Sequence, residues 1–357
     1  MTAASPTIVV VGAAAIDEWY AVTNIPEPDG GAYASEVTTA AGGVGANVAV
    51  ALDGLGRDVG LVSRVGDDAY GRRARESLDS TGVDTARVRV GDDPTTRSVI
   101  LRDPDGERAI VTAGESFRKL RLDAADREAI AAADVVFLTA YTPDEVSRAV
   151  LRTVESAAAD DEASDTTSGP PRLVFDLSGS IEELIGRGTE PETIHRLLHR
   201  ADLFVAGDVA AAAYFGGREA AVRRIAAAQA TREGSPDART SNGRSGDGWP
   251  RAVLTHGADG VTVVTDGERR SFDAFEVDAV DATGAGDAFV AGLIDQWIAA
   301  AEPVAPGVRF AAAVAAINCQ SRFTQPGLPT RAEVEAFLGE RGDRGDSGFD
   351  SDRRDGR

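Results

Sequence analysis

Short apolar segments rich in β-branched residues alternate with helix-like segments along the chain, and this alternation restricts the fold more than any other feature. The expected strands lie at 8–11, 59–65, 135–138, 173–176, 203–206, 253–255 and 261–264. Segments with helical spacing lie between them, at 46–55, 70–81, 144–156, 192–199, 210–215 and 218–230. Strands that are joined by helices form parallel crossover connections. The sequence therefore predicts an α/β fold in which a mostly parallel central sheet is covered by helices on both faces.

The charge balance limits the partners of the protein. Asp and Glu together number 58 against 37 Lys and Arg, which gives a formal net charge of −21. A surface of this sign repels nucleic-acid phosphates and anionic membranes, so we expect neither as a partner. Lys119 is the single lysine, and arginine supplies the other positive charges. Strong acidity combined with arginine in place of lysine favours a salt-loving source organism.

The single cysteine limits disulfides and zinc sites, and the lack of long apolar runs indicates where in the cell the protein is expected. Cys319 is the single cysteine, so an intrachain disulfide and a Cys-based zinc site are both excluded. The first residues lack a basic patch followed by an apolar core, and no run approaches the ~20 apolar residues of a membrane span. We therefore expect a soluble, cytoplasmic protein.

A glycine-rich turn near the carboxyl end carries the strongest chemical signal. Residues 281–287 read DATGAGD and precede a run of small apolar residues. Such a turn between strand and helix lets backbone N–H groups converge on an anion, as the stabilisation of a transferred phosphoryl group requires. Asp287 stands at the start of the helix, where its carboxylate can accept a proton from an attacking hydroxyl. A plain helix cap is the alternative interpretation.

A second glycine-rich segment lies near the amino end. Residues 42–47 read GGVGAN and precede the helix-like segment 46–55. Glycine allows a ligand to approach the backbone closely, and Asn47 offers both a donor and an acceptor to a hydroxyl group. The alternative is a helix start that packs tightly against a strand.

Together these two segments resemble the signature motifs of the ribokinase-like, or PfkB-type, sugar kinases. The resemblance extends from about residue 8 to 338 and includes Gly12 and Asp17, THGADG at 255–260 and QPGLPT at 325–330. It implies a ribokinase-like three-layer sandwich over residues 1–340. A small β-sheet lid is expected from about 17–39 and 88–112. We expect residues 341–357 to form a disordered polar tail.

The resemblance also implies a role for individual residues. The implied catalytic residues are Asp287, as the base, and the turn that precedes it and binds an anion, namely Gly284, Ala285 and Gly286. The substrate group, expected to bind hydroxyls or a phosphate, is Asp17, Gly43, Asn47 and the lid arginine Arg97, with Arg102 as the other candidate. The nucleotide group, expected beside the triphosphate and adenosine, is Thr255, Gly257, Gly260, Asp281 and Thr283.

ATP and Mg²⁺ are the implied cofactors, with a monovalent cation such as K⁺ near Asp281 as a further option. Most members of the family carry Asn-x-x-Glu after a mid-chain strand, but Gly207 and Ala210 occupy those positions here. Asp208 is the nearest carboxylate, and we expect it to hold magnesium through water. A solvated helix cap is the alternative for Asp208.

The expected activity is ATP-dependent phosphoryl transfer to a hydroxyl of a small sugar, sugar phosphate or nucleoside. A ribose-like acceptor is favoured, and lid arginines would suit ribose 1-phosphate. Aromatic residues near the lid, namely Trp19, Tyr20 and Tyr33, would instead suit a nucleoside. The alternative of another class is a catalytically weak sugar-binding or regulatory protein with the same fold, which the loss of Asn-x-x-Glu favours. By analogy we expect a homodimer formed through the lid.

Overall fold

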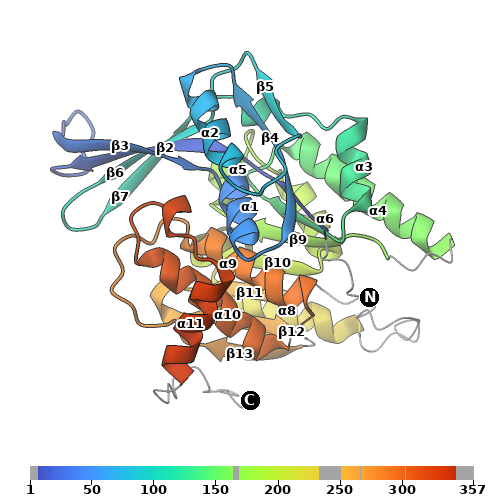
Figure 1. Cartoon of the computed structure of the whole chain (residues 1–357). Coiled ribbons are helices and arrows are strands. Elements are labelled where there is room, and N and C mark those ends of the chain that lie inside the picture. The colour runs from blue at the N-terminus through green and yellow to red at the C-terminus, as the bar shows by residue number, and fades with distance from the viewer. Residues whose placement is uncertain (1–6, 164–168, 233–250, 266, 302, 343–357) are drawn as a thin grey trace.

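The computed structural model describes residues 7–163, 169–232, 251–265, 267–301 and 303–342. The expected polar tail lies outside the described residues from position 343 onward. A large body with helices on both sides carries a smaller sheet that projects from it (Figure 1). Within the described ranges, no helix is both long enough and apolar enough to cross a membrane.

The large sheet confirms the expected mostly parallel arrangement. Its nine strands run in the order β13-β12-β11-β10-β9-β8-β1-β4-β5. In chain order they are β1 (Thr7–Val11), β4 (Asp58–Gly66), β5 (Val88–Gly91), β8 (Val135–Thr139), β9 (Arg172–Leu177), β10 (Leu203–Gly207), β11 (Arg251–Thr255), β12 (Val261–Thr265) and β13 (Glu268–Phe272). The pairs β11/β12 and β12/β13 are antiparallel, and the other pairs are parallel.

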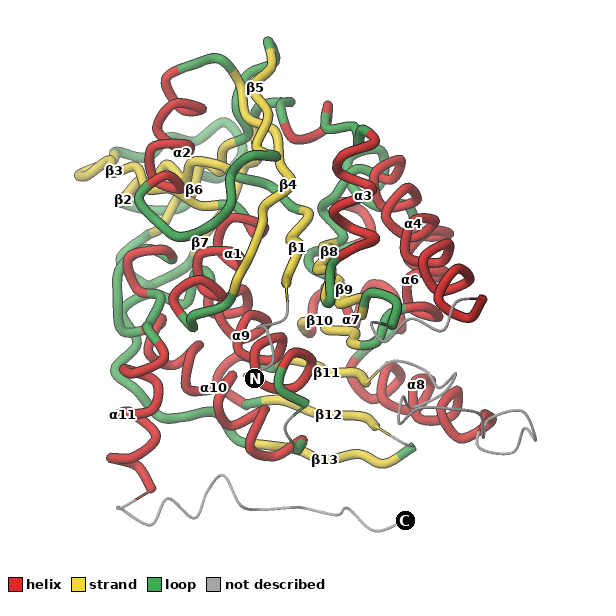
Figure 2. Tube along the Cα trace, turned by 45° about the vertical axis from the view of Figure 1, so that its right-hand side comes forward, coloured by secondary structure: helices red, strands yellow, loops and turns green. Residues whose placement is uncertain are grey.

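Helices cover both faces because the strands are apolar on both faces. Along β1, Ile8 and Val10 belong to one buried cluster, whereas Val9 and Val11 belong to the other. The first layer consists of α1 (Val44–Gly54), α2 (Ala69–Asp79), α9 (Ala285–Leu293), the π-helical η3 (Ile294–Ala299), α10 (Val304–Cys319) and α11 (Arg331–Gly342). The second consists of α3 (Ala124–Ala132), α4 (Asp144–Ala163), α5 (Ile181–Leu184), α6 (Pro191–Arg200), α7 (Asp208–Phe215) and α8 (Arg218–Arg232). Figure 2 shows the two layers on opposite sides of the sheet.

The projecting sheet is the lid, and its strand order is β3-β2-β6-β7. The strands are β2 (Ala15–Val22), β3 (Ala34–Gly42), β6 (Arg97–Arg102) and β7 (Arg108–Ala113). The expected lid segment 88–112 begins too early, because Val88–Gly91 pairs with β4 as the edge strand of the large sheet. The second half of the lid therefore starts at Arg97.

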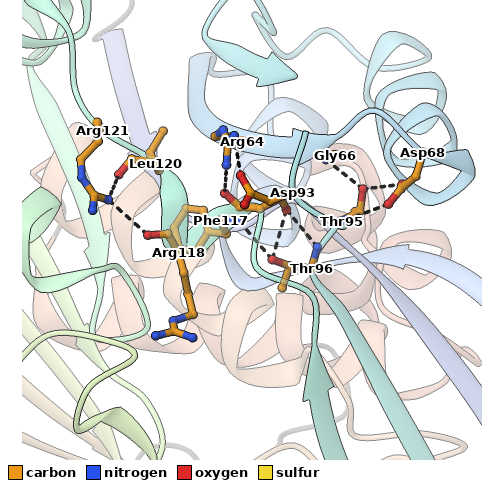
Figure 3. A network of polar contacts seen from close by, with 11 residues as sticks. Arg64, Gly66, Asp68, Asp93, Thr95, Thr96, Phe117, Arg118, Leu120 and Arg121 are labelled. Carbon is orange, nitrogen blue, oxygen red and sulfur yellow. Dashed lines mark hydrogen bonds and ion pairs between the residues drawn. The ribbon is translucent and has the colours of Figure 1, made fainter. Parts of the chain in front are cut away.

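A polar network anchors the lid to the large sheet, at the end of β4 (Figure 3). The hydroxyl of Thr95 donates to Asp68 over 2.6 Å and accepts from the backbone N–H of Gly66 over 2.9 Å. Arg64 of β4 forms an ion pair of 2.8 Å with Asp93. These contacts fix the segment just before β6 to the end of β4. The second half of the lid therefore starts at the carboxyl end of the parallel strands.

Candidate active site

The two glycine-rich segments start two helices that meet at their amino ends. Gly43 (φ 93°) precedes α1, and Gly284 (φ 80°) precedes α9. Both backbones lie in the left-handed region that favours glycine. The amide of Asn47 donates a hydrogen bond of 2.8 Å to Asp287, and Gln325 donates to the Asn47 carbonyl oxygen over 3.3 Å. The structure thus brings together Asn47 and Asp287, which are 240 positions apart.

Two further carboxylates lie near Asp287, in the region between the lid and the start of α9 that we call the cleft. Asp17 lies on β2 of the lid and Asp176 near the end of β9, and both are buried. The pKa of Asp287 is raised to about 7, mainly by burial and also by the negative charges of Asp176 and Asp17, against the bond from Asn47. Burial likewise raises the pKa of Asp17 and the pKa of Asp176 to about 6. Within the described ranges none of the three forms an ion pair, so a cationic or proton-releasing ligand suits the cleft.

Tyr141 completes this carboxylate-lined part of the cleft. Partial desolvation raises the pKa of its phenol above the usual range, although Tyr141 is 39% exposed, and the charges of Glu183, Asp176 and Asp287 act in the same direction. Our sequence interpretation assigned no role to Asp176 or Tyr141. An acidic residue at the carboxyl end of the apolar segment 173–176 was the available signal, because ligands bind where parallel strands end.

The first turn of α9 offers anion-binding donors beside Asp287. The N–H groups of Gly286 and Asp287 belong to the first turn, where a helix has no carbonyl of its own to bond. A Cβ added to Gly286 would meet no atom within 4 Å, so a ligand can approach it closely. Ala285 contributes less than expected, because its N–H already donates to the carbonyl of Ala282 over 3.3 Å.

Asp281 and Thr283 hold the loop before α9. The buried carboxylate of Asp281 accepts from the N–H groups of Thr283 (3.0 Å) and Phe323 (3.3 Å). Two lid arginines reach the same loop: Arg102 donates to the carbonyl of Val280 and Arg108 to the hydroxyl of Thr283, each over 3.2 Å. These two bonds connect the lid with the loop before α9.

Arg97 does not join these arginines. Neighbouring residues of a strand point to opposite faces, and Ser98, beside Arg97, bonds to Asp17 on the cleft face. The Arg97 guanidinium instead lies 3.9 Å from Glu18 and over the ring of Tyr70. The structure thus turns Arg97 away from Asp287, while Arg102, the other candidate, faces the cleft.

The aromatic candidates also separate by face. Trp19 alternates with Asp17 on the cleft face, and its ring packs edge-on against Phe323, with centroids 5.7 Å apart. Tyr20 follows Trp19 in β2 and points to the outer face. Tyr33 is 72% exposed. Of the three, only Trp19 lies on the cleft face, and it is buried there.

The other three residues of the expected nucleotide group, Thr255, Gly257 and Gly260, lie at or just after the end of β11, away from Asp281 and Thr283. Thr255 ends β11, and η2 (Gly257–Asp259) follows it. Gly260 has φ 87°, and a Cβ there would meet the Phe272 carbonyl at 2.1 Å, so the turn requires glycine. Gly207, which replaces the usual Asn, lies beside Thr255, since its added Cβ would be 3.6 Å from the Thr255 hydroxyl.

Asp208 has protein partners at this corner. Its carboxylate accepts from Arg218 at 3.0 and 2.6 Å and lies 2.8 Å from Nδ1 of His256. The bond to Arg218 is the main cause that lowers the pKa of Asp208. Gly207, not Asp208, is the N-cap of α7. Asp208 is therefore an ion-paired residue and not the solvated cap of the alternative interpretation, and its role as a water-mediated metal ligand stays a prediction.

Comparisons with known proteins identify the family of the chain. The family model of the pfkB family carbohydrate kinases matches residues 5–172 and 243–331. An ATP-dependent ribose-1-phosphate kinase from Halopiger xanaduensis is 33% identical over 323 residues, which cover 90% of this chain and 94% of the relative. A ribokinase from Haemophilus influenzae is 27% identical over 339 residues, covering 93% and 98%.

Solved structures show the same fold. The structure of Arabidopsis thaliana ribokinase complexed with ribose and ATP matches with a TM-score of 0.74 at 24% identity, covering 94% of this chain and 99% of that one. The fold is therefore ribokinase-like, as expected. The chain belongs to the pfkB family of carbohydrate kinases and is a phosphotransferase that acts on an alcohol group.

Proposed function

We propose that the protein transfers the γ-phosphoryl group of ATP to a hydroxyl of ribose 1-phosphate or a closely similar phosphorylated pentose. The observation that carries the proposal is the pair of Asn47 and Asp287 beside the free first-turn N–H groups of α9. The pair supplies an oriented proton acceptor, and the N–H groups supply an anion cradle within reach of it.

The proposed reaction uses these groups together. Asp287 accepts the proton of the attacking hydroxyl, whose oxygen bonds to the γ-phosphorus while the bond to the leaving ADP oxygen breaks. The N–H groups of Gly286 and Asp287 stabilise the charge on the transferred group. A pKa of about 7 leaves a substantial fraction of Asp287 ready to accept a proton near neutral pH.

The lid arginines support a phosphorylated acceptor. Arg102 and Arg108 lie on the cleft face of the lid and use one guanidinium nitrogen each, Nη1, for Val280 and Thr283. Guanidinium groups bind phosphate in a bidentate manner, so these two residues suit a phosphate on the sugar. The similarity to a ribose-1-phosphate kinase points to the same acceptor.

The residues fit a magnesium ion that arrives with ATP. In the described part of the chain, no group of three or more His, Cys, Asp or Glu residues could hold a metal by itself. Mg²⁺ commonly keeps several waters and binds mainly through substrate phosphates. It would neutralise charge on the phosphate oxygens. We propose Asp176, buried and without an ion pair in the described structure, as the carboxylate that faces its water shell, in place of Asp208.

A monovalent cation near Asp281 fits a second feature of the site. Asp281 is 5% exposed and forms no ion pair within the described ranges. Its two N–H partners leave the full negative charge without a counter-ion. A buried carboxylate is stable when a cation pairs with it, and K⁺ would serve here.

We also propose a homodimer formed through the outer face of the lid. Val37 and Val111, on strands at opposite edges of the lid sheet, are 54% and 59% exposed on this face. Cross-strand partners such as Tyr20 and Leu101 extend the apolar surface between them. Light scattering of the purified protein would measure its mass and test this assembly.

A panel of acceptors tests the proposed function. ADP release would be followed with ATP, Mg²⁺ and ribose 1-phosphate, ribose, fructose or a nucleoside. We expect the highest kcat/KM with ribose 1-phosphate. Loss of both charge-assisted contacts in the Arg102→Gln/Arg108→Gln variant should reduce that value about tenfold or more but leave ribose nearly unchanged.

Arg97→Gln is the matched control, because Arg97 faces away from the cleft, and it should behave as wild type. Equal losses on ribose and ribose 1-phosphate would contradict the assignment of the arginines. If no acceptor is phosphorylated, the alternative of a sugar-binding protein is favoured.

A further inference from the structure

A cavity lies at the other ends of α1 and α9, away from Asp287. Its volume is about 740 Å³. It is lined by the loop after α1, by η3, by α10 and by the first turns of α11, including Leu55, Arg57, Gln296, Phe310, Arg331 and Glu335. Ligand sites usually measure about 300–1,000 Å³, so a small organic molecule fits.

A buried carboxylate with two arginines forms one wall of this cavity. Asp295 of η3 is fully buried. Arg57 Nε and Arg331 Nη2 donate to the same Asp295 oxygen, at 2.5 and 2.6 Å. The amide of Gln296 donates to the other oxygen over 2.6 Å. Two positive charges thus meet one negative charge, and the cluster keeps a surplus of one positive charge.

The arginines retain donors for a further partner. Arg57 also bonds to the Asp295 carbonyl (2.9 Å), and Arg331 to the Leu55 carbonyl (3.0 Å). These bonds use Nε and Nη2, and in the described structure Nη1 of each group has no partner. Arg331 and Ala332 begin α11; Glu333 and Thr330 cap this start through mutual hydrogen bonds, which leaves the N–H groups of Arg331 and Ala332 as the first-turn donors that favour an anion. One carboxylate, the exposed Glu335, lines the cavity and opposes an anion.

We propose that this cavity binds a small phosphate-bearing molecule as an effector. Its phosphate would bind Nη1 of Arg57 and of Arg331 near the start of α11. The ring of Phe310 lies beneath Arg331, with the guanidinium 5.6 Å from the ring centroid, and offers an apolar surface to the rest of the ligand.

The cavity is mechanically connected to the catalytic pair. At their amino ends α1 and α9 are joined by the bond of Asn47 to Asp287, and at their other ends by the ion pair of Arg57 with Asp295. Helix α9 continues directly into η3, so Asp287 and Asp295 are roughly 12 Å apart along one continuous helix. A π-helical turn such as η3 is a frequent feature of functional sites. A ligand on Arg57 and Arg331 would therefore change the geometry that orients Asp287, and with it kcat.

Calorimetric titration with inorganic phosphate tests the proposal, in potassium glutamate so that chloride does not compete. Ala332→Glu places a carboxylate in the cavity without removing either arginine. We expect it to weaken phosphate binding at least tenfold. Ala336→Glu, on the same helix but outside the lining, is the control and should bind as wild type. Glu335→Gln should tighten binding several-fold.

The proposal is wrong if the wild-type protein binds no phosphate. It is also wrong if Ala332→Glu binds phosphate as tightly as wild type, because the phosphate would then bind elsewhere, at the catalytic residues. Melting temperatures of the variants would establish that each is folded. Saturating phosphate should change kcat in wild type and in Ala336→Glu. In Ala332→Glu, this phosphate-dependent change in kcat should be absent. The binding measurement needs no turnover, so its failure is distinct from failure of the proposed kinase reaction.

Discussion

The starts of α9 and α7 have the same local pattern and opposite chemistry. In each, an Asp lies in the first turn of a helix that follows a glycine at the carboxyl edge of the sheet. Asp287 has an amide partner, Asn47, and its pKa is raised to about 7 by burial among other carboxylates. Asp208 has the guanidinium of Arg218, and its pKa is lowered.

The difference shows that a helix start does not determine what its carboxylate does. A positive partner holds a carboxylate in its charged form and makes it a poor proton acceptor, whereas burial without a cation makes it a better one. Asp287 is therefore suited to general-base work, and Asp208 to holding α8 and the segment after β11 together through Arg218 and His256.

The largest expected effect separates the two residues by activity. Asp287→Asn should reduce kcat by ~10² to 10⁴, because an amide cannot accept the hydroxyl proton. The matched change Asp208→Asn should keep kcat within a few-fold of wild type. Steady-state kinetics with the preferred acceptor would measure both. Near-normal turnover in Asp287→Asn would remove the base assignment.

The pH dependence sharpens the comparison. Because Asp287 must be deprotonated to act, kcat/KM should rise as pH increases through about 7. Asp176→Asn removes a negative charge that helps raise the pKa of Asp287, so the rising limb should move to lower pH. Asp208→Asn should leave the limb in place. A limb that does not respond to Asp176→Asn would show that the two carboxylates are not electrostatically coupled.

A smaller effect is expected when the ion pair at α7 is removed. Asp208→Ala leaves Arg218 and His256 without their carboxylate, so stability should fall by roughly 1 kcal/mol. The KM for ATP should rise a few-fold, and the magnesium concentration for half-maximal rate should not change. Glu219→Ala, which breaks the exposed pair with Arg269, is the control. If Asp208→Ala needs clearly more magnesium for half-maximal rate, Asp208 contacts the water shell of the metal.

Several elements were predictable because their signals are local. The strands 8–11, 135–138 and 203–206 were recognisable as short apolar runs, and each lies in the large sheet. Helix α10 had no expected counterpart, since it is rich in alanine around its whole circumference and has no amphipathic stripe. Strand β5 was assigned to the lid because four residues cannot indicate which sheet they will join.

The sequence by itself determined the family, the α/β order and the place of Asp287 after its glycine turn. These depend on hydrophobic periodicity and turn chemistry within a few residues. Only the tertiary structure decided that Asp176 and Tyr141 join Asp287, that Arg97 faces outward and that Asp208 pairs with His256, 48 positions away. Electrostatic roles depend on which charges approach in space, and a residue's neighbours in the chain do not reveal those partners.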